Sequence, residues 1–237
     1  MNPKNRTLVS FTVLGAFFLL VWASWSFAWS RPLRAGVPAP FRAVLEWNGK
    51  IWQSLYSNAR VAPAKAPAAG TEPRVNGEIG LEEEIDLAKW KLEVVSVEGK
   101  SNFLTMADLQ KLPRTEATFN FKCIEGWSEV MSFAGVKFSD FLFAYGLSEK
   151  VPYVGLETPD GTYYVSIDMA SMLHPQTLLA FEMNGKALAQ ENGAPLRLAI
   201  PVKYGIKNLK RIGKIFFSRE RPRDYWAEQG YDWFSGL

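Results

Sequence analysis

The stretch FNFKCIEGWS, residues 119–128, holds the only cysteine of the chain, Cys123. Its alternating Phe-x-Phe pattern predicts a β-strand that ends near the cysteine, and Gly126 predicts a turn directly after it. Free cysteine is among the most frequently buried residues, so Cys123 fits a small hydrophobic core residue. At a strand end its side chain can also leave the core, where a thiolate acts as a nucleophile or as a soft metal ligand. The residues alone leave these interpretations open.

The other residues of the chain limit the chemistry that Cys123 could take part in. One cysteine and one histidine, His174, exclude a multi-cysteine zinc site, a cysteine-ligated iron–sulfur cluster and a bis-histidine haem within this chain. One protein ligand does not hold a bare metal ion, but it can complete the coordination of a metal that a cofactor carries. A base for a nucleophilic cysteine would have to be His174, which precedes a proline and is more typical of a loop.

The composition fits one globular domain with an appendage. The chain has 237 residues, of which 48% are apolar and 22% charged, and its net charge is +3. Both signs of charge are mixed and no long basic run occurs, so the sequence argues against a nucleic-acid partner.

The appendage is the N-terminal run TLVSFTVLGAFFLLVWASWSFAWS, residues 7–30, which has no charged residue. It is long enough for a helix that crosses a bilayer, and Trp22, Trp25 and Trp29 are placed as an interfacial aromatic belt. A signal peptide is the alternative, but its apolar region would be shorter. We therefore expect an uncleaved single-pass anchor over residues 1–30 in the inner (cytoplasmic) membrane. Basic residues on both sides of the run leave its orientation undecided.

Residues 31–73 connect this run to the domain. The apolar residues of FRAVLEWNGKIWQSLYSNAR, 41–60, recur at helical spacing, which predicts a juxtamembrane amphipathic helix. Such a helix would lie on the membrane surface or against a partner, or would be an ordinary short surface helix. The Pro/Ala-rich segment 61–73 predicts a linker, and the domain would occupy 74–237.

The domain sequence predicts an α+β fold with a mostly β core, because short strand-like runs dominate and helical pieces are short. The expected strands are 90–97, 115–123, 151–158, 162–167, 177–183, 196–200 and 210–217. The expected helices are 105–112, with a capping-box-like Thr at its start, 139–146 and 224–229.

A second group of polar residues lies in NGAPLRLAIPVKYGIKNLKRI, 192–212. Its polar and charged members are Asn192, Arg197, Lys203, Lys207, Lys210 and Arg211. Arginine offers a planar fork and lysine a point charge to a phosphate, and glycine lets backbone N–H groups approach an anion. The segment therefore fits an anion site, and it equally fits a solvated basic face.

Taken together, these stretches resemble the sulfite-oxidase-type molybdenum enzymes, and most closely the bacterial branch that contains the methionine-sulfoxide reductase catalytic subunits. The resemblance runs in order through most of 74–237. Its motifs are KCIEGWS (122–128), AGVKFSDFL (134–142), LETPDG (156–161), HPQTLLAFEMNGKAL (174–188), NGAPLRLAIPVKYGIKNLKRI (192–212) and YWAEQGY (225–231).

The resemblance implies a sulfite-oxidase-type molybdopterin-binding fold and a set of site residues. Cys123 would be the catalytic thiolate ligand of a molybdenum ion held by one molybdopterin. The positions that match pterin contacts are Thr158, Asn192, Arg197, Asn208, Leu209 and Lys210, and a looser match in RVNGEIG adds Asn76, Gly77 and Glu78. The implied chemistry is two-electron oxygen-atom transfer, either reduction of a sulfoxide or N-oxide, or oxidation of sulfite.

The resemblance also implies partners. The substrate would be an oxo compound, either a small molecule or a protein, and the sequence shows no dedicated set of arginines for sulfite. We expect electrons to be exchanged with a membrane cytochrome or quinone-linked redox subunit, and the domain to face the periplasm, although MNPKNRTLVSF lacks an Arg-Arg export pair. The alternative is a non-enzymatic docking or assembly subunit of a membrane complex that keeps the fold.

Overall fold

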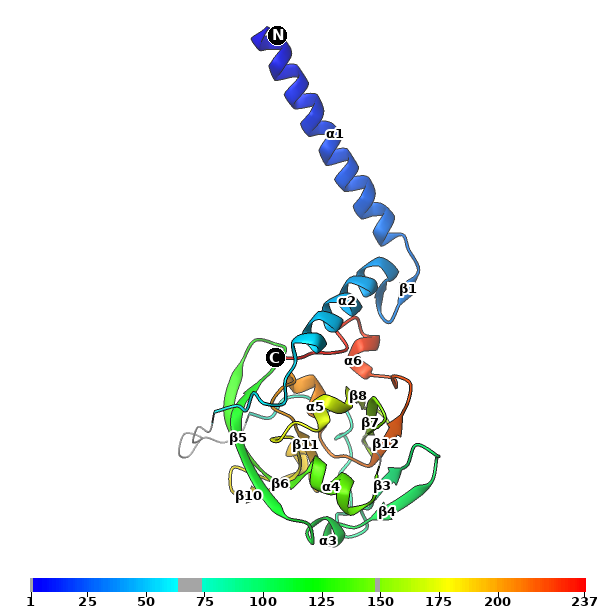
Figure 1. Ribbon diagram of the computed structural model, residues 1–237, viewed down its shortest axis with the longest axis vertical. Helices are drawn as coiled ribbons and strands as arrows, with labels where there is room; N and C mark the ends of the chain where they lie inside the picture. Colours follow the sequence, from blue (N-terminus) through cyan, green and yellow to red (C-terminus); the bar gives the residue numbers. More distant parts are fainter. Residues whose placement is uncertain (1, 64–73, 148–149) are drawn as a thin grey trace.

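A computed structural model describes residues 2–63, 74–147 and 150–237. Helix α1 (Pro3–Trp29) rises from one end of the molecule, and α2 (Ala39–Leu55) lies between it and the β-rich domain (Figure 1). A short hairpin of β1 (Leu33–Arg34) and β2 (Val37–Pro38) joins the two helices. No residue of α1 is buried, and by length and composition it could cross a membrane, a property that signal sequences share.

Two sheets form the domain. The first has the order β10-β9-β6-β5, with β11 also paired to β9, and all of its pairings are antiparallel. Its strands are β5 (Arg114–Lys122), β6 (Ser128–Lys137), β9 (Leu178–Met183), β10 (Lys186–Ala187) and β11 (Arg197–Ala199). The second has the order β4-β3-β12-β7-β8, in which only β12 and β3 run parallel. Its strands are β3 (Leu92–Val95), β4 (Ser101–Leu104), β7 (Tyr153–Glu157), β8 (Tyr164–Asp168) and β12 (Lys214–Ser218).

Short helices connect the strands. They are α3 (Met106–Leu109), α4 (Phe138–Ala144), α5 (Met169–Met172), α6 (Tyr225–Glu228) and the 3-10 turns η1 (Gln190–Asn192) and η2 (Gly205–Lys207). The predicted capping box is present: the Thr105 hydroxyl accepts from the backbone N–H of Asp108, whose carboxylate accepts from that of Thr105. Two hydrogen bonds thus satisfy donors that would otherwise be free at the start of α3.

The main apolar core lies between the two sheets. It combines side chains of the first sheet, such as Val136 and Leu198, with side chains of the second, such as Leu156 and Ile215. The α+β class with a β core is therefore confirmed, and the three predicted short helices correspond to α3, α4 and α6.

Among its described residues the domain contains three strands that the sequence did not predict, β4, β6 and β10, and one predicted strand begins later than expected. Strand β6 was not predicted, because SEVMSFAGVK mixes apolar and small residues without clear alternation; most of it is buried between its neighbours. The strand expected over 210–217 begins only at Lys214, because Arg211 adopts a left-handed backbone with φ of 50° and turns the chain. That turn brings residues 208–211 toward the N-terminal side of the domain.

Two buried ion pairs hold the segment that precedes this turn. The Lys207 ammonium contacts the carboxylate of Asp224, and the Lys203 ammonium lies 3.0 Å from the carboxylate of Asp168. Burial lowers the pKa of Lys203 to about 8, although Asp168 opposes the shift. A buried charge is tolerated when a partner of opposite sign and hydrogen bonds compensate it. These pairs therefore fix η2 against β8 and α6.

We predict that Asp224→Asn destabilises the domain strongly, because the amide keeps the shape of the side chain but leaves the buried Lys207 charge uncompensated. The expected loss in free energy of unfolding is about 3 kcal/mol. Denaturant unfolding at pH 7 measures it.

The matched control is Glu228→Gln in α6, the helix that Asp224 caps; the Glu228 carboxylate pairs with the exposed Arg223. An exposed pair is screened by solvent, so this variant should lose far less stability. Equal losses in the two variants would show that the charge of Asp224 is not what matters.

A cavity at the end of strand β5

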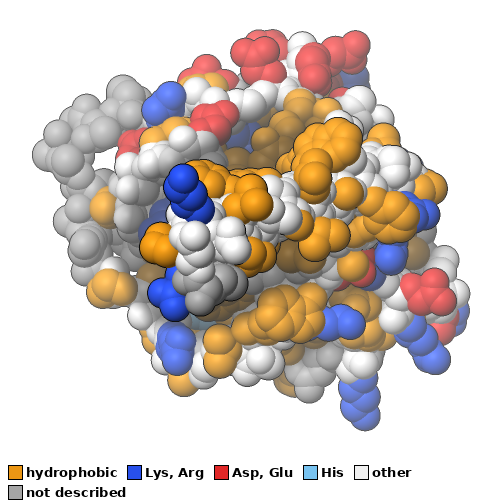
Figure 2. All heavy atoms as spheres, turned by 90° about the horizontal axis from the view of Figure 1, so that it is seen from above, with side chains coloured by type: hydrophobic (Ala, Val, Ile, Leu, Met, Phe, Trp, Pro, Cys, Tyr) orange, Lys and Arg blue, Asp and Glu red, His pale blue; other side chains and the backbone are white. Residues whose placement is uncertain are grey.

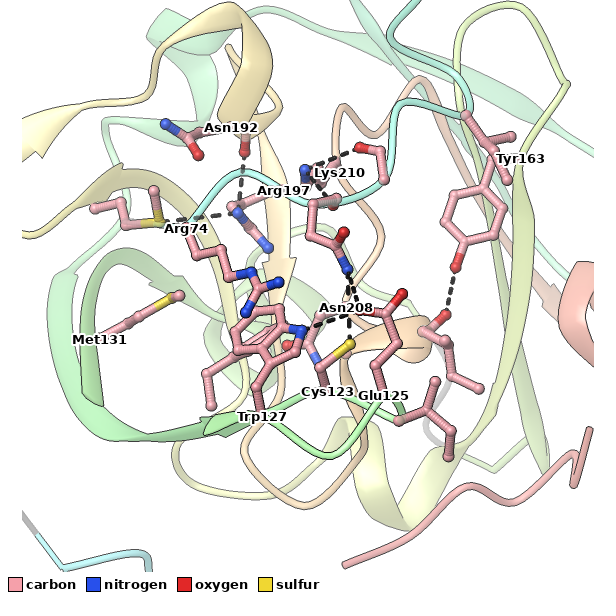
Figure 3. A pocket seen from close by; sticks show the side chains of 18 residues that line it. Arg74, Cys123, Glu125, Trp127, Met131, Tyr163, Asn192, Arg197, Asn208 and Lys210 are labelled. Atoms are coloured by element: carbon pink, nitrogen blue, oxygen red, sulfur yellow. Dashed lines mark hydrogen bonds between the residues drawn. The ribbon is translucent and has the colours of Figure 1, made fainter. Parts of the chain in front are cut away.

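A cavity opens beside the end of β5, and it encloses about 830 Å³ of space that is partly open to solvent. Figure 3 shows that its walls come from several segments that are distant in sequence. The lining residues are Arg74, Asn76, Gly77, Ile79, Phe121, Cys123, Ile124, Glu125, Trp127, Met131, Tyr163, Met183, Asn192, Arg197, Gly205, Ile206, Asn208 and Lys210.

Cys123 lies at the rim of the core, and 8% of its surface is exposed. Its backbone N–H donates to the carbonyl of Trp127 (2.9 Å), and its own carbonyl accepts from the N–H of Gly126 (3.1 Å). Gly126 has a φ of 92°, a left-handed conformation that favours glycine. The tight turn between β5 and β6 therefore fixes the backbone of Cys123 and leaves its thiol in the cavity wall.

A small polar network surrounds this thiol (Figure 3). The amide nitrogen of Asn76 lies 3.8 Å from Sγ of Cys123 and donates to Oε2 of Glu125 at 3.0 Å. The indole N–H of Trp127 donates to the same carboxylate oxygen at 3.1 Å, and the Arg74 guanidinium lies 4.8 Å from the centre of the indole ring. The network places an N–H donor beside the sulfur.

Arg197 is a buried cation at the opposite wall. Its Nη1 donates to the carbonyl of Asn192 (3.1 Å), its guanidinium lies 5.2 Å from the centre of the Phe133 ring, and its Nε has no hydrogen-bond partner. Among the described residues no carboxylate lies within ion-pair distance of it, and burial lowers its pKa to about 10. A buried arginine in this state lacks a negative charge to compensate its own and an acceptor for its Nε–H.

Lys210 is the second such cation. Its ammonium donates to the carbonyls of Asn76 (2.8 Å), Gly77 (3.1 Å) and Glu191 (3.3 Å), and across the described ranges no carboxylate forms an ion pair with it. Burial, followed by the positive charge of Arg197, lowers the pKa of Lys210 to about 8. Two cations without carboxylate partners in one cavity fit a phosphate, whose oxygens accept charge-assisted hydrogen bonds.

The donor set does not fit a bare metal ion. Within the described residues no group of three metal-ligating side chains occurs, and Cys123 supplies one sulfur. It fits a cofactor that brings its own metal to the sulfur and a phosphate to the two cations. The unpartnered Nε of Arg197 is the observation that favours such an anionic group.

The structure brings together most of the predicted site residues. Those that line the cavity are Asn76, Gly77, Cys123, Asn192, Arg197, Asn208 and Lys210. The side chain of Asn208 braces a loop, because its Oδ1 accepts from the N–H of Ile200 at 2.8 Å and its Nδ2 donates to the carbonyl of Tyr204 at 3.2 Å. Their roles as ligands stay predictions.

Three predicted residues do not line the cavity. The Thr158 hydroxyl accepts from the N–H of Tyr163 (3.1 Å) inside a local turn, Leu209 is fully buried in the main core, and Glu78 is exposed. Lys203 and Lys207 also lie elsewhere, in the buried ion pairs described above. Thr158, Leu209 and Glu78 stay predictions as cofactor contacts, and the structure gives Thr158 and Leu209 structural contacts.

Several cavity residues were not singled out as site residues from the sequence. They are Arg74, Trp127, Met131, Tyr163 and Met183. Tyr163 donates to the carbonyl of Ile206 at 2.6 Å, and burial raises its pKa. Trp127, Arg74 and Met183 stand within the quoted segments KCIEGWS, RVNGEIG and HPQTLLAFEMNGKAL, whereas Met131 and Tyr163 lie outside those segments, and their approach to the cavity depends on the fold.

We predict that Arg197→Met, made in protein without cofactor, leaves the free energy of unfolding unchanged or raises it by about 1–3 kcal/mol. The reason is that it removes a buried charge that no carboxylate compensates. Denaturant unfolding measures the change, and the same variant should fail to retain a bound phosphate compound.

Lys207→Met is the matched control, because it removes a buried cation whose partner, Asp224, is present. This variant should be strongly destabilised. If Arg197→Met loses as much stability as Lys207→Met, then Arg197 is a structural charge and the anion site is wrong.

Comparison with known proteins agrees with this donor set. The family model described as the oxidoreductase molybdopterin binding domain matches residues 79–226, which is more than half of the chain. A putative protein-methionine-sulfoxide reductase subunit of Azospira oryzae is 35% identical over 203 residues, which cover 84% of this chain and 77% of that protein. The protein-methionine-sulfoxide reductase catalytic subunit MsrP of Campylobacter jejuni is 34% identical over 164 residues, 62% of this chain and 55% of its own.

A solved structure supports the fold. The sulfane dehydrogenase SoxCD from Paracoccus pantotrophus matches with a TM-score of 0.54 and 23% identity, over 59% of this chain and 40% of that one. The chain is therefore similar to enzymes that share a β-rich molybdopterin domain, and this domain spans only part of several of them. On the family match and on the relatives, this chain belongs to the family of oxidoreductases with a molybdopterin-binding domain of the sulfite-oxidase type.

Proposed function

We propose that this chain is a membrane-anchored molybdenum-cofactor enzyme that reduces methionine sulfoxide, free or within a protein. Cys123 would bind the metal, and Arg197 and Lys210 would bind the phosphate of the pterin. The names of the Azospira and Campylobacter relatives support this substrate, and the chemistry of the cavity wall supports it independently.

The observation that carries the proposal is the apolar character of the wall near Cys123. Trp127, Met131 and Ile124 line it, and Arg74 is the cation there, stacked on the indole of Trp127. A sulfite anion must exchange its water for several compensating charges, whereas a sulfoxide is a neutral dipole with apolar substituents. This wall therefore suits a sulfoxide better than sulfite.

The chemistry follows from this arrangement. The bound cofactor supplies two-electron oxygen-atom transfer, in which a sulfoxide, two electrons and two protons give a sulfide and water. The Asn76 amide would donate a hydrogen bond to the sulfur of Cys123 and so moderate its charge. Trp127 and Met131 would hold the apolar substituents of the substrate and exclude water, and the Arg74 guanidinium would donate to the sulfoxide oxygen.

Each turnover consumes two electrons, so another molecule must reduce the cofactor again after each reaction. We propose a membrane cytochrome or quinone-linked subunit as the donor, with the domain on the periplasmic side of the inner membrane. Support comes from α1, which is long and apolar enough to span a bilayer, and from the naming of the relatives as subunits.

We expect detergent-purified wild-type protein to contain about one molybdenum and one pterin per chain. It should reduce methionine sulfoxide with an artificial reductant, and it should leave sulfite unoxidised with an artificial electron acceptor. Cys123→Ser should stay folded and lose nearly all turnover, because a serine hydroxyl is a poor substitute for a thiolate ligand. Metal analysis, pterin fluorescence and a turnover assay measure these outcomes.

Two results would contradict the proposal in different ways. Full turnover by Cys123→Ser would refute the ligand role of that residue. Absence of both metal and pterin from folded protein, made by cells that synthesise the cofactor, would favour the docking or assembly subunit.

We also predict that cofactor retention depends on pH through Lys210. Its pKa is about 8 in the free protein, and a bound phosphate raises it because the phosphate favours the ammonium form. Below pH 8 the lysine is protonated both with and without cofactor, so affinity does not vary through this group. Above pH 8 binding requires uptake of a proton, so affinity falls about tenfold per pH unit until the pKa of the complex is reached.

Pterin content after dialysis of the holoprotein at pH 7 and pH 9.5 tests this. Wild type should lose more pterin at the higher pH, and Lys210→Met should lose it at both. Lys210→Arg should retain it at both, because a guanidinium stays charged. A loss at pH 9.5 that is the same in wild type and Lys210→Arg would assign the dependence to another group.

A further inference from the structure

Helix α2 packs on the domain through its polar face. Arg42 is buried, and its guanidinium donates to the carbonyls of Ala227 (2.6 Å) and Tyr231 (2.9 Å). Glu46, on the same side of the helix, lies 3.3 Å from the guanidinium of Arg221. Gly49, one turn further on, is also buried.

The apolar face of α2 points away from the domain. Val44, Trp47 and Leu55 have exposed fractions of 60%, 65% and 56%, and Ile51 lies between them on the same stripe. At 100° per residue this stripe lies on the opposite side of the helix from Arg42. An ordinary surface helix does the reverse and turns its apolar stripe to the core. The stripe is formed by Val44, Trp47, Ile51 and Leu55; Ile51 is half-buried, and the other three side chains lack a cover in this structure.

The stripe continues from the end of α1. The rings of Trp25 and Trp29 contact the ring of Phe41 at centroid distances of 5.4 and 5.3 Å. Phe41 stands on the flank of the apolar stripe, so the aromatic end of α1 and the stripe form one surface. If α1 crosses a bilayer, its tryptophans mark the interface, and α2 begins at that depth.

The charge of this region suits a lipid surface. Apart from the buried Arg42, residues 31–60 contain four basic residues and one acidic residue. Figure 2 looks onto the face from which α1 rises and shows hydrophobic side chains over much of it, Lys and Arg among them, and most visible Asp and Glu at two margins. Apolar residues with flanking basic charge are typical of helices that bind anionic lipid headgroups.

We propose that α2 is an interfacial helix whose stripe of Val44, Trp47, Ile51 and Leu55 is inserted at the surface of an anionic bilayer. This deepens the proposed function and rests on its membrane anchor. The polar face of α2 is fixed to the domain by Arg42, so insertion of the stripe gives the domain one defined orientation on the membrane rather than a free tether. A lipid surface is favoured over a protein partner because the stripe is continuous with the end of the anchor.

Environment-sensitive labels on the full-length holoprotein test this. Single cysteines are introduced at Val44 in the stripe, at Leu14 in the middle of α1, and at Phe143, an apolar residue of α4 that is 90% exposed at the far end of the domain. Each is labelled with NBD in vesicles of phosphatidylethanolamine and phosphatidylglycerol, and quenching by lipid-borne nitroxide is compared with quenching by aqueous cobalt. The parent protein, in which Cys123 is buried, gives the labelling blank.

We expect nitroxide to quench the Val44 and Leu14 labels, and cobalt to quench the Val44 label about five-fold less than the Phe143 label. Equal cobalt quenching at Val44 and Phe143, with Leu14 in lipid, would overturn the interfacial helix and leave the anchor intact. Cobalt quenching at all three positions would overturn the anchor itself. A Val44 label that is exposed in vesicles and protected only in native membranes would show that a protein partner covers the stripe, which also overturns the lipid proposal.

Discussion

The lysines that hold the cavity wall have carboxylate partners, whereas the two cations in the cavity have none among the described residues. Lys203 and Lys207 are paired with Asp168 and Asp224, and these pairs fix η2. Arg197 is as deeply buried and Lys210 is partly buried, and both donate to backbone carbonyls and have no carboxylate partner among the described residues. Removing the partner of a buried charge costs about 3–5 kcal/mol, so a cation without a carboxylate needs another form of compensation. Backbone carbonyls provide it at Arg42, and on the proposed function a bound anion adds it at Arg197 and Lys210. The paired lysines thus support the cavity wall, and the cations without a carboxylate partner are available to bind an anion.

Local patterns in the sequence predicted much of the fold. The strands around Cys123, the capping box at Thr105 and the helix that starts after Asp224 all follow from spacing, turn residues and caps. Strand β6 did not, because it is buried on both faces and a buried strand lacks alternation.

The site could be predicted only where one segment carries several of its residues. KCIEGWS and 192–212 are such segments, and most of the predicted ligands within them do line the cavity. The segment 192–212 does not predict that Lys203 and Lys207 pair with carboxylates, because these lie more than fifteen residues away in the sequence. The contact of Arg74 with Trp127 also depends on the fold. Helix α2 is a further example. Its periodicity predicted an amphipathic helix, but the face that packs on the domain is set by the hydrogen bonds from Arg42 to distant backbone carbonyls.

The end of β5 connects the cavity to the side of the molecule that carries α2. Side chains alternate across a strand, so Asn120 and Lys122 point outward while Phe121 and Cys123 point to the cavity. The outward residues line a separate groove together with Trp52 and Leu55 of α2. On the proposed function, the substrate enters the cavity and meets Cys123. An electron donor in the membrane approaches from the groove, which is lined by Lys122, the neighbour of Cys123 in the chain. An orientation fixed by α2 would keep that groove at the bilayer while the cavity stays open to substrate, so that the two reactants need not compete for one entrance.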